Sequence, residues 1–138
     1  ILKKLFPILM SFKTFKFAKI INSNGSLIPI DLKKFPNFKI KRFFILTGKK
    51  NDVRGNHAHK KCTQIFVPIA GRIELEIFNK KTKKRLILDT KLKKGVYVKP
   101  LNWCKIKFLK NSSSMIVLCN YKFLENEYIR KFKVFLKY

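Results

Sequence analysis

The sequence predicts an all-β protein, folded as a sandwich or a closed barrel, with one short helix at its C-terminal end. Short segments in which apolar and polar residues alternate recur about every eight to twelve residues, which is typical of antiparallel strands. Turns rich in Gly, Asn, Pro or Lys separate these segments, and no helical pattern comes between them. So many short strands favour an architecture that protects both edges of a sheet.

The elements follow in order along the chain. The expected strands begin with FKTFKF at 12–17, SLIPI at 26–30, FKIKRFFIL at 38–46, NHAHK at 56–60 and QIFVPI at 64–69. They continue with RIELEIF at 72–78, RLILDT at 85–90, GVYVK at 95–99, WCKIKFL at 103–109 and MIVLCN at 115–120. The helix is expected over ENEYIRKFKVFLKY, where Tyr128, Phe132 and Phe135 or Leu136 form one apolar stripe. Glu125 and Glu127 near its start suit the helix dipole.

Length and composition predict a single domain over residues 1–138. Hydrophobic residues make up 46% of the chain and include fourteen Phe, enough for one packed core. The apolar part of ILKKLFPILM is too short for a signal peptide, so we expect residues 1–9 to be a disordered leader or a segment added during cloning. No stretch reaches the roughly eighteen apolar residues of a membrane span. Cys62, Cys104 and Cys119 form no CxxC pair, so neither a disulfide framework nor a zinc knuckle is predicted, and a reducing cytoplasm fits best.

The net charge of +26 raises the question of a polyanionic partner. Most of the basic residues are Lys scattered along the whole chain, whereas Arg, which makes bidentate contacts to phosphates and bases, occurs at only five positions. This distribution favours a solvated basic surface. A non-catalytic protein that binds nucleic acid or another polyanion is the alternative function, and nucleic acid is the less favoured partner.

Two features break the simple alternation of the strands. Arg42 lies in phase with Phe38, Ile40 and Phe44 if the strand at 38–46 is regular, so its guanidinium either meets an anionic partner or reaches to the rim. The only two histidines, in RGNHAHK, are two residues apart and would share one face of a strand. They could ligate a metal, transfer protons or form a structural pair.

The segment HAHKKCTQIFVPIAG resembles the first motif of cupins, which are small β-barrels. In that motif the histidine pair is followed by a glutamate and then a glycine, and here Gln64 stands at the acid position and Gly71 at the glycine. The region GVYVKPLNWCKIKF resembles the second cupin motif but contains no histidine. Two of the four expected metal ligands are therefore missing, and a neutral amide replaces a carboxylate poorly, so we expect no catalytic metal.

A closer resemblance is carried by KIKRFFILTGKKNDVRGNHAHKKCTQIFVPIAGRIELEI, GVYVKPLNW and ENEYIRKFKVFL. Together they are similar to the nucleotide-diphospho-sugar 3,4-ketoisomerases of the WxcM-like, FdtA type, over about residues 22–137. The resemblance implies a homodimeric cupin-type jelly-roll β-barrel. It also implies conversion of dTDP-4-keto-6-deoxy-glucose into its 3-keto isomer, a step toward 3-amino sugars of surface polysaccharides. It places His57 and His59 on the active-site histidines and Arg42 and Arg54 on motif arginines.

The expected chemistry suits these residues. Moving the ketone from C4 to C3 requires a base for the C3 proton, and a neutral imidazole can serve at neutral pH without any cofactor. We expect His59 to be the base because it lies deeper along its strand, with His57 or Arg42 stabilising the oxyanion. Arg54 or Lys60 would bind the diphosphate. Further contacts to the substrate are expected from Gln64, Tyr97 and Trp103.

One strand departs from the family pattern. Members carry a tyrosine after the Lys-Arg pair, whereas this chain has Phe43, Phe44 and Ile45 there. Tyr97 and Tyr121 are the remaining candidates for the missing phenol. Histidines in a concave cavity would favour the isomerase, and histidines on a convex basic surface would favour the polyanion binder. The strand at 12–17 is a candidate for exchange with the second copy of a homodimer.

Overall fold

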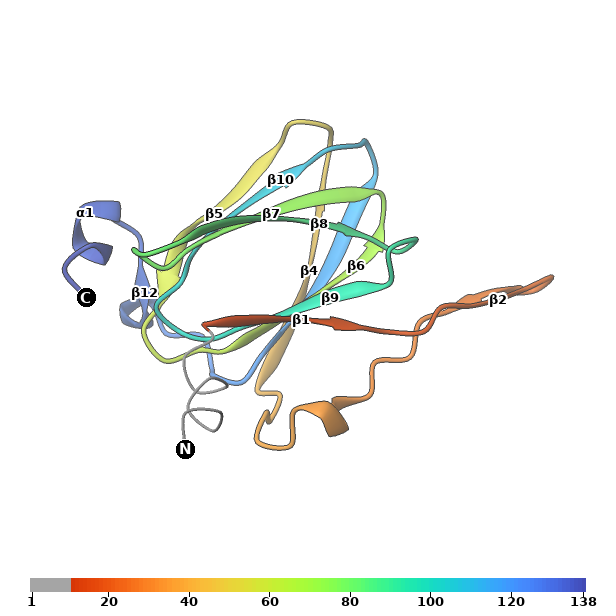
Figure 1. The fold of residues 1–138 in the computed structure, drawn as a ribbon, viewed down its shortest axis with the longest axis horizontal. Helices are drawn as coiled ribbons and strands as arrows, with labels where there is room; N and C mark the ends of the chain where they lie inside the picture. Colours follow the sequence, from red (N-terminus) through yellow and green to blue (C-terminus); the bar gives the residue numbers. More distant parts are fainter. Residues whose placement is uncertain (1–10) are drawn as a thin grey trace.

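The structure, a computed structural model, describes residues 11–138; the expected leader at 1–9 lies outside the described residues. Two five-stranded antiparallel sheets pack face to face (Figure 1). The first holds, in spatial order, β1 (Phe12–Lys16), β9 (Lys94–Val98), β6 (Gln64–Ala70), β11 (Ser113–Cys119) and β4 (Arg42–Gly48). The second holds β12 (Tyr128–Ile129), β5 (Val53–His59), β10 (Trp103–Phe108), β7 (Arg72–Phe78) and β8 (Lys83–Asp89). The predicted all-β fold is confirmed.

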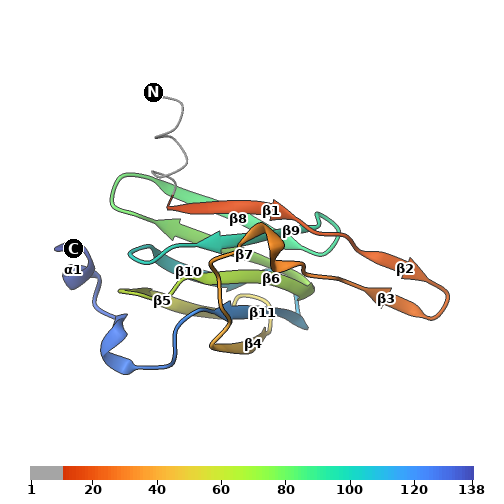
Figure 2. The same cartoon turned by 90° about the horizontal axis from the view of Figure 1, so that it is seen from below.

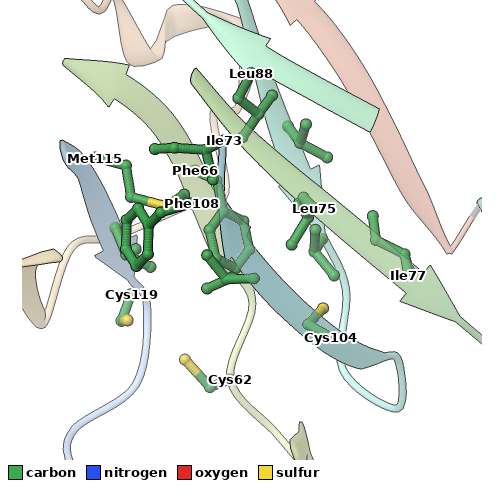
Figure 3. Close-up of a cluster of buried hydrophobic side chains, with 14 residues drawn as sticks. Cys62, Phe66, Ile73, Leu75, Ile77, Leu88, Cys104, Phe108, Met115 and Cys119 are labelled. Atoms are coloured by element: carbon green, nitrogen blue, oxygen red, sulfur yellow. The ribbon is translucent and has the colours of Figure 1, made fainter. Parts of the chain in front are cut away.

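The main core lies between the two sheets, where alternate side chains of both meet (Figure 3). In β7, for example, Ile73, Leu75 and Ile77 are buried while the residues between them are half-buried, as a period of two requires. Phe108 and Met115, from β10 and β11, are fully buried against them. The hydrophobic effect at this contact holds the sheets together and fixes which face of each strand points inward.

A second apolar cluster covers the outer face of the first sheet. Phe15, Ile65 and Leu118 contribute from the strands, and Phe38 is buried with them. The segment that covers them includes a single 3-10 turn, Leu32–Lys34, which Asp31 caps by accepting a hydrogen bond from the backbone N–H of Lys33. The first sheet is therefore apolar on both faces.

The hairpin of β2 (Ile20–Asn22) and β3 (Gly25–Leu27) pairs with no other described strand. Figures 1 and 2 both show it projecting from the body of the molecule. Ile20, Ile21 and Leu27 on it are 51%, 70% and 59% exposed. An isolated two-stranded hairpin is only marginally stable in water, so a partner surface would stabilise it.

Most of the predicted strands are confirmed to within a few residues, but two segments differ. The strand predicted at 38–46 begins only at Arg42, so the expectation that Phe38 and Ile40 share its inner face is wrong: Phe38 belongs to the outer cluster and Ile40 is exposed. The helix predicted over 125–138 is confined to α1 (Phe132–Phe135), preceded by the 3-10 turn Glu125–Glu127 and by β12. Within residues 11–138, no helix has the length and apolar character needed to cross a membrane.

Candidate active site

A bulge in β5 gives the histidine segment its geometry. Gly55 and Asn56 both have left-handed backbones, with φ of 85° and 56°, and the pairing register between β5 and β10 shifts there. As a result Arg54 lies opposite Ile106 and His57 opposite Cys104, two residues apart on β10. Arg54 and His57 would point to opposite faces of a regular strand, and the extra residue brings them onto the same face.

That face lines a cavity of about 450 Å³ between the two sheets. Its lining mixes apolar and polar side chains; among them Gln64 is buried and Arg54 is exposed. Gln64 donates a hydrogen bond from Nε2 to Sγ of Cys119 across 3.5 Å. The lining residues are Arg42, Phe44, Leu46, Val53, Arg54, Gly55, His57, Gln64, Phe66, Cys104, Ile106, Tyr128 and Arg130.

His59 lies beside this cavity and is held by a carboxylate. Its Nδ1 is 2.7 Å from Oε1 of Glu127, and both side chains are almost completely buried. The other oxygen, Oε2, accepts hydrogen bonds from the backbone N–H groups of Lys61 and Cys62 at 3.1 and 3.3 Å. Because Glu127 accepts on both sides, Nδ1 of His59 carries the proton and Nε2 has a free lone pair. That Nε2 is buried without a hydrogen-bond partner.

Both imidazoles are uncharged at neutral pH. Burial, followed by the nearby His59, lowers the pKa of His57 to about 4. Burial also lowers the pKa of His59, although its hydrogen bond to Glu127 opposes the shift. The two rings lie edge to face with centroids 5.1 Å apart. A neutral imidazole can accept a proton from a substrate, so the pair has the protonation state that a general base needs.

Tyr128 lies where the functional groups of the cavity meet. Its ring centroid is 4.4 Å from that of His59 and 5.1 Å from that of His57. Its hydroxyl oxygen accepts a hydrogen bond from Nη2 of Arg42 at 2.5 Å. The guanidinium of Arg42 also lies over the rings of Phe44 and Phe123, at 5.4 and 5.5 Å. Two histidines, a phenol and an arginine thus converge on one side of the cavity.

The structure brings together five of the eight residues predicted from the sequence. Arg42, Arg54, His57 and Gln64 line the cavity, and His59 lies next to it. The other three, Lys60, Tyr97 and Trp103, do not reach the cavity.

Strand parity and the bend after β5 explain these three differences. Val96 and Val98 point into the main core, so Tyr97 between them points outward and stacks on Phe35 with centroids 4.8 Å apart. Trp103 packs against the C-terminal segment, 5.6 Å from Phe135. Lys60 follows the end of β5 and lines a separate hollow. None of the three therefore lines the cavity at which the histidines lie.

Sequence reasoning did not assign roles to Glu127, Tyr128 and Arg130. All three come from the segment predicted to be a helix, whereas its backbone forms β12 and pairs Tyr128 with His59. A two-residue strand has no readable period, so the only signal was the similarity of ENEYIRKFKVFL to the end of the family sequence.

The residues present do not fit the metal site common in cupins. The imidazole of His57 and the neutral amide of Gln64 line the cavity, and the second imidazole, His59, lies beside it. Among residues 11–138, His59, Cys62 and Glu127 form a group with potential ligand atoms within 4.8 Å of one another. In this group, however, Nδ1 of His59 and both oxygens of Glu127 already share hydrogen bonds. The donor set therefore favours proton transfer over metal binding.

These features define the class: a jelly-roll protein with an acid–base cavity between its sheets. The chain belongs to the family described as WxcM-like, C-terminal (FdtA), which matches residues 10–138. It is 35% identical over 130 residues to the TDP-4-oxo-6-deoxy-alpha-D-glucose-3,4-oxoisomerase of Aneurinibacillus thermoaerophilus, covering 94% of this chain and 93% of that protein. The resemblance seen in the sequence is confirmed.

Two solved structures share the fold closely. QdtA, a sugar 3,4-ketoisomerase from Thermoanaerobacterium thermosaccharolyticum solved in complex with TDP, superposes with a TM-score of 0.83 at 27% identity and 94% coverage of both chains. A 3,4-ketoisomerase from Helicobacter canadensis superposes with a TM-score of 0.82 at 31% identity, covering 93% of this chain and 96% of that one.

Proposed function

We propose that this protein is a metal-independent sugar-nucleotide 3,4-ketoisomerase that converts dTDP-4-keto-6-deoxy-glucose into its 3-keto isomer. The product would feed the synthesis of 3-amino sugars for surface polysaccharides such as lipopolysaccharide. The observation that carries the proposal is the pair of neutral histidines, His57 and His59, at a cavity that also holds Arg42 and Tyr128. The relatives named above act in the same reaction class.

The reaction needs a base for the C3 proton, and His59 is proposed for that role. Glu127 fixes the tautomer of His59 with Nε2 free, as carboxylate–histidine pairs do in other acid–base sites. The C3 proton is acidified by the neighbouring carbonyl, so its removal gives an enediolate. His57, which lines the cavity directly, would donate a hydrogen bond to a sugar oxygen. No redox cofactor is needed because hydrogen moves only within the sugar.

The cations at the cavity rim suit a diphosphate. Arg54 and Arg130 are both exposed lining residues; Arg54 lies on β5, and Arg130 directly follows β12. An arginine can bind two phosphate oxygens at once. Lys60 lies outside the cavity, so Arg54 is the proposed diphosphate ligand and Arg130 is its proposed second partner.

The polyanion-binding alternative is not favoured. The histidines lie at a concave site, with His59 only 5% exposed, instead of on a convex basic surface. The high charge then reflects a lysine-rich surface around an anionic substrate site.

We also propose that the protein is a homodimer and works in the cytoplasm. The projecting hairpin β2–β3 supports a dimer, since a second copy could cover its exposed Ile20, Ile21 and Leu27. The strand predicted to be exchanged, β1, pairs with β9 of the same chain along its whole length, which leaves the hairpin as the better candidate for contact with a second copy. Cys62, Cys104 and Cys119 are unpaired thiols, in keeping with a reducing compartment. Sedimentation at micromolar concentration should give twice the mass of one chain, and a monomer would contradict the proposal.

The function is tested by incubating the protein with dTDP-4-keto-6-deoxy-glucose, trapping the product with an aminotransferase and identifying it by NMR. His59→Asn should lose about 10²- to 10⁴-fold in rate, the usual cost of losing a general base. His57→Asn should affect substrate affinity more and proton transfer less. Solvent deuterium exchange at C3 separates the roles. If His59→Asn exchanged as fast as the parent while His57→Asn did not, the two assignments would be reversed.

A further inference from the structure

Two of the three cysteines are neighbours in the main core, and neither takes part in the proposed reaction. Cys119 ends β11, and Cys62 lies just before β6, the strand that pairs with β11. A hydrogen bond joins the two thiols, and Figure 3 shows their sulfur atoms turned toward each other. Both residues are buried, with 1% and 0% of their surfaces exposed. A buried pair of adjacent thiols has a chemistry of its own.

The backbone holds these two cysteines in neighbouring positions. Cys119 lies opposite Gln64 in the register of β11 and β6. Beyond that pair, the backbone N–H of Asn120 donates to the carbonyl oxygen of Thr63 at 3.2 Å, and the Asn120 side chain accepts from the N–H of Thr63 at 2.7 Å. Cys62 is therefore diagonally opposite Cys119. Because residues two apart along an extended chain share a face, its side chain points inward beside that of Gln64.

The two thiols differ in acidity. The hydrogen bond from Cys62, with smaller contributions from Gln64 and Arg42, lowers the pKa of Cys119 to about 7, although burial opposes the shift. The same hydrogen bond, together with burial, raises the pKa of Cys62. A large share of Cys119 is thus thiolate at neutral pH, and the thiolate is the form of cysteine that reacts as a nucleophile.

The cavity between the sheets gives a small oxidant a route to Cys119. Gln64, which lines the cavity, donates from Nε2 to Sγ of Cys119 at 3.5 Å. Arg42, a second lining residue, is near enough for its charge to act on the same sulfur. A hydrogen peroxide molecule is little larger than water and fits easily into a cavity of about 450 Å³. A movement of the Gln64 amide would open the sulfur to that cavity.

Cys104 is a control that the protein itself contains. It lines the cavity directly, so an oxidant reaches it at least as easily as it reaches Cys119. Burial alone raises the pKa of Cys104 to about 12, and no second thiol within residues 11–138 acts on it. If access decided which thiol reacts, Cys104 would be oxidised first. If thiolate character and a neighbouring thiol decide, Cys119 is oxidised first.

We propose that Cys62 and Cys119 are an oxidation site, at which hydrogen peroxide forms a reversible disulfide between them. The Cys119 thiolate attacks one peroxide oxygen, the O–O bond breaks, and the hydroxide that leaves takes up the proton that Cys119 lost on ionising. Cys119 is then a sulfenic acid. The sulfur of Cys62 attacks the sulfur of Cys119, the S–O bond breaks, and the hydroxyl group leaves with the Cys62 proton as water. The thiol pair is oxidised by two electrons, and the peroxide is reduced to water.

Forming this disulfide requires Cys62 to move. Diagonal neighbours in an antiparallel pair have Cα atoms about 7 to 8 Å apart, whereas a disulfide usually spans about 4.4 to 6.8 Å between Cα atoms. Cys62 precedes the first residue of β6, and its backbone N–H donates to Oε2 of Glu127 at 3.3 Å. A shift of Cys62 disturbs that hydrogen bond, and Glu127 in turn holds His59. We therefore expect oxidation to slow isomerisation without any change at the cavity lining.

The test needs no substrate. The whole protein is treated with hydrogen peroxide, remaining thiols are blocked with iodoacetamide, and the chain is cut with trypsin without a reductant. Trypsin places the three cysteines on separate peptides, residues 62–72, 95–105 and 111–122, so mass spectrometry identifies each one. The parent should give the Cys62–Cys119 cross-link, which dithiothreitol removes, while Cys104 stays alkylated. Cys104→Ser should form the same cross-link.

Variants of the pair separate its two steps. In Cys62→Ser, the sulfenic acid on Cys119 has no partner and should be trapped by dimedone. Cys119→Ser should leave Cys62 unoxidised, because Cys62 keeps its proton. Oxidation of Cys104 ahead of Cys119, or a parent whose Cys62 and Cys119 both stay alkylated, would refute the site. So would a cross-link that forms only in denaturant, and since the parent alone decides these outcomes, a misfolded variant does not obscure them.

A second measurement follows the consequence for Glu127. The peroxide-treated parent should lose about tenfold or more of its isomerisation rate, the cost of one hydrogen bond to a charged group, and should recover it in dithiothreitol. Cys119→Ser should keep its own untreated rate after peroxide. A cross-linked parent with an unchanged rate would refute the coupling to Glu127 and leave the disulfide in place. If the parent did not isomerise the substrate at all, the proposed function would fail, whereas the peptide map would still decide the oxidation site.

Discussion

Replacing Glu127 with Gln should switch the tautomer of His59 and so remove the base. In the parent, Oε2 of Glu127 accepts from two backbone N–H groups and Oε1 accepts from Nδ1 of His59. Glutamine has only one carbonyl oxygen, and the backbone donors of Lys61 and Cys62 cannot become acceptors. The amide oxygen therefore turns toward the backbone and the NH₂ group faces His59. Nδ1 must then accept a hydrogen bond, which moves the ring proton to Nε2.

The size of the effect follows from this geometry. With Nε2 protonated, no lone pair faces the substrate, so the rate should fall by the cost of a general base, about 10²- to 10⁴-fold. That range corresponds to about 3 to 5 kcal/mol of transition-state stabilisation. Folding should lose less, about 1 to 3 kcal/mol, because the three hydrogen bonds of the carboxylate become neutral ones but keep their partners.

Two measurements are needed on Glu127→Gln. The rate of isomerisation comes from NMR of the sugar, and the tautomer comes from nitrogen–proton correlation spectra of the two histidine rings. The matched control is Glu76→Gln on β7, where the carboxylate binds Lys83 and Arg85 near the surface and away from the cavity. This control should keep the parent rate, because exposed ion pairs contribute little.

The reasoning would be refuted in either of two ways. A Glu127→Gln protein that isomerises at the parent rate would show that the carboxylate has no part in catalysis. A slow variant whose His59 still carries its proton on Nδ1 would show that Glu127 acts by some route other than the tautomer.

Three further predictions concern stability and metal content. Gly55→Ala should destabilise the protein by about 1 to 3 kcal/mol, because φ at this position is 85° and an added Cβ would lie 2.8 Å from the carbonyl oxygen of Cys104. Urea unfolding measures the change, and an unchanged urea midpoint would contradict the bulge geometry. The free energy of unfolding should fall as the pH drops from 6.5 to about 4, because over this range the unfolded chain binds a proton that the half-buried His57 of the folded protein does not. His57→Asn should flatten this dependence on pH, and an equal slope in both proteins would contradict the prediction. Protein purified without added metal should contain no stoichiometric zinc, iron or manganese, and it should keep its activity when a chelator is added. If the protein contained such a metal, and the chelator removed both the metal and the activity, the prediction of a metal-independent site would be wrong.

The alternation of side chains was sufficient to predict most strands and the inward histidines. RIELEIF was predicted as the strand β7 with its observed bounds, because a strand buried on one face shows a clean period of two. The His57–His59 pair kept its common orientation for the same reason. Arg54 reached the same face only through the bulge, and the Gly-Asn pair that makes the bulge possible is visible in RGNH.

The missing parts of the site depend on contacts between distant segments. Tyr97 stands between two valines, and a V-Y-V run does not show which of its faces points inward when both faces of the sheet are apolar. Tyr128 looked helical because apolar residues follow it at a helical spacing, but pairing with His59 on β5 gives its backbone better hydrogen bonds. Such tertiary pairing overrides local propensity, and one sequence alone does not reveal it.

In the chain, the strands from β1 to β11 all come before the segment that carries Glu127, Tyr128 and Arg130. Ribosomes deliver a polypeptide from its N-terminus, so the strands from β1 to β11 are all available before the segment that completes the cavity emerges. Phe135, fully buried beside Ala58 and Ile129, then anchors that segment onto β5. Acquisition of catalytic competence is thus a late event of maturation, separable in time from collapse of the body.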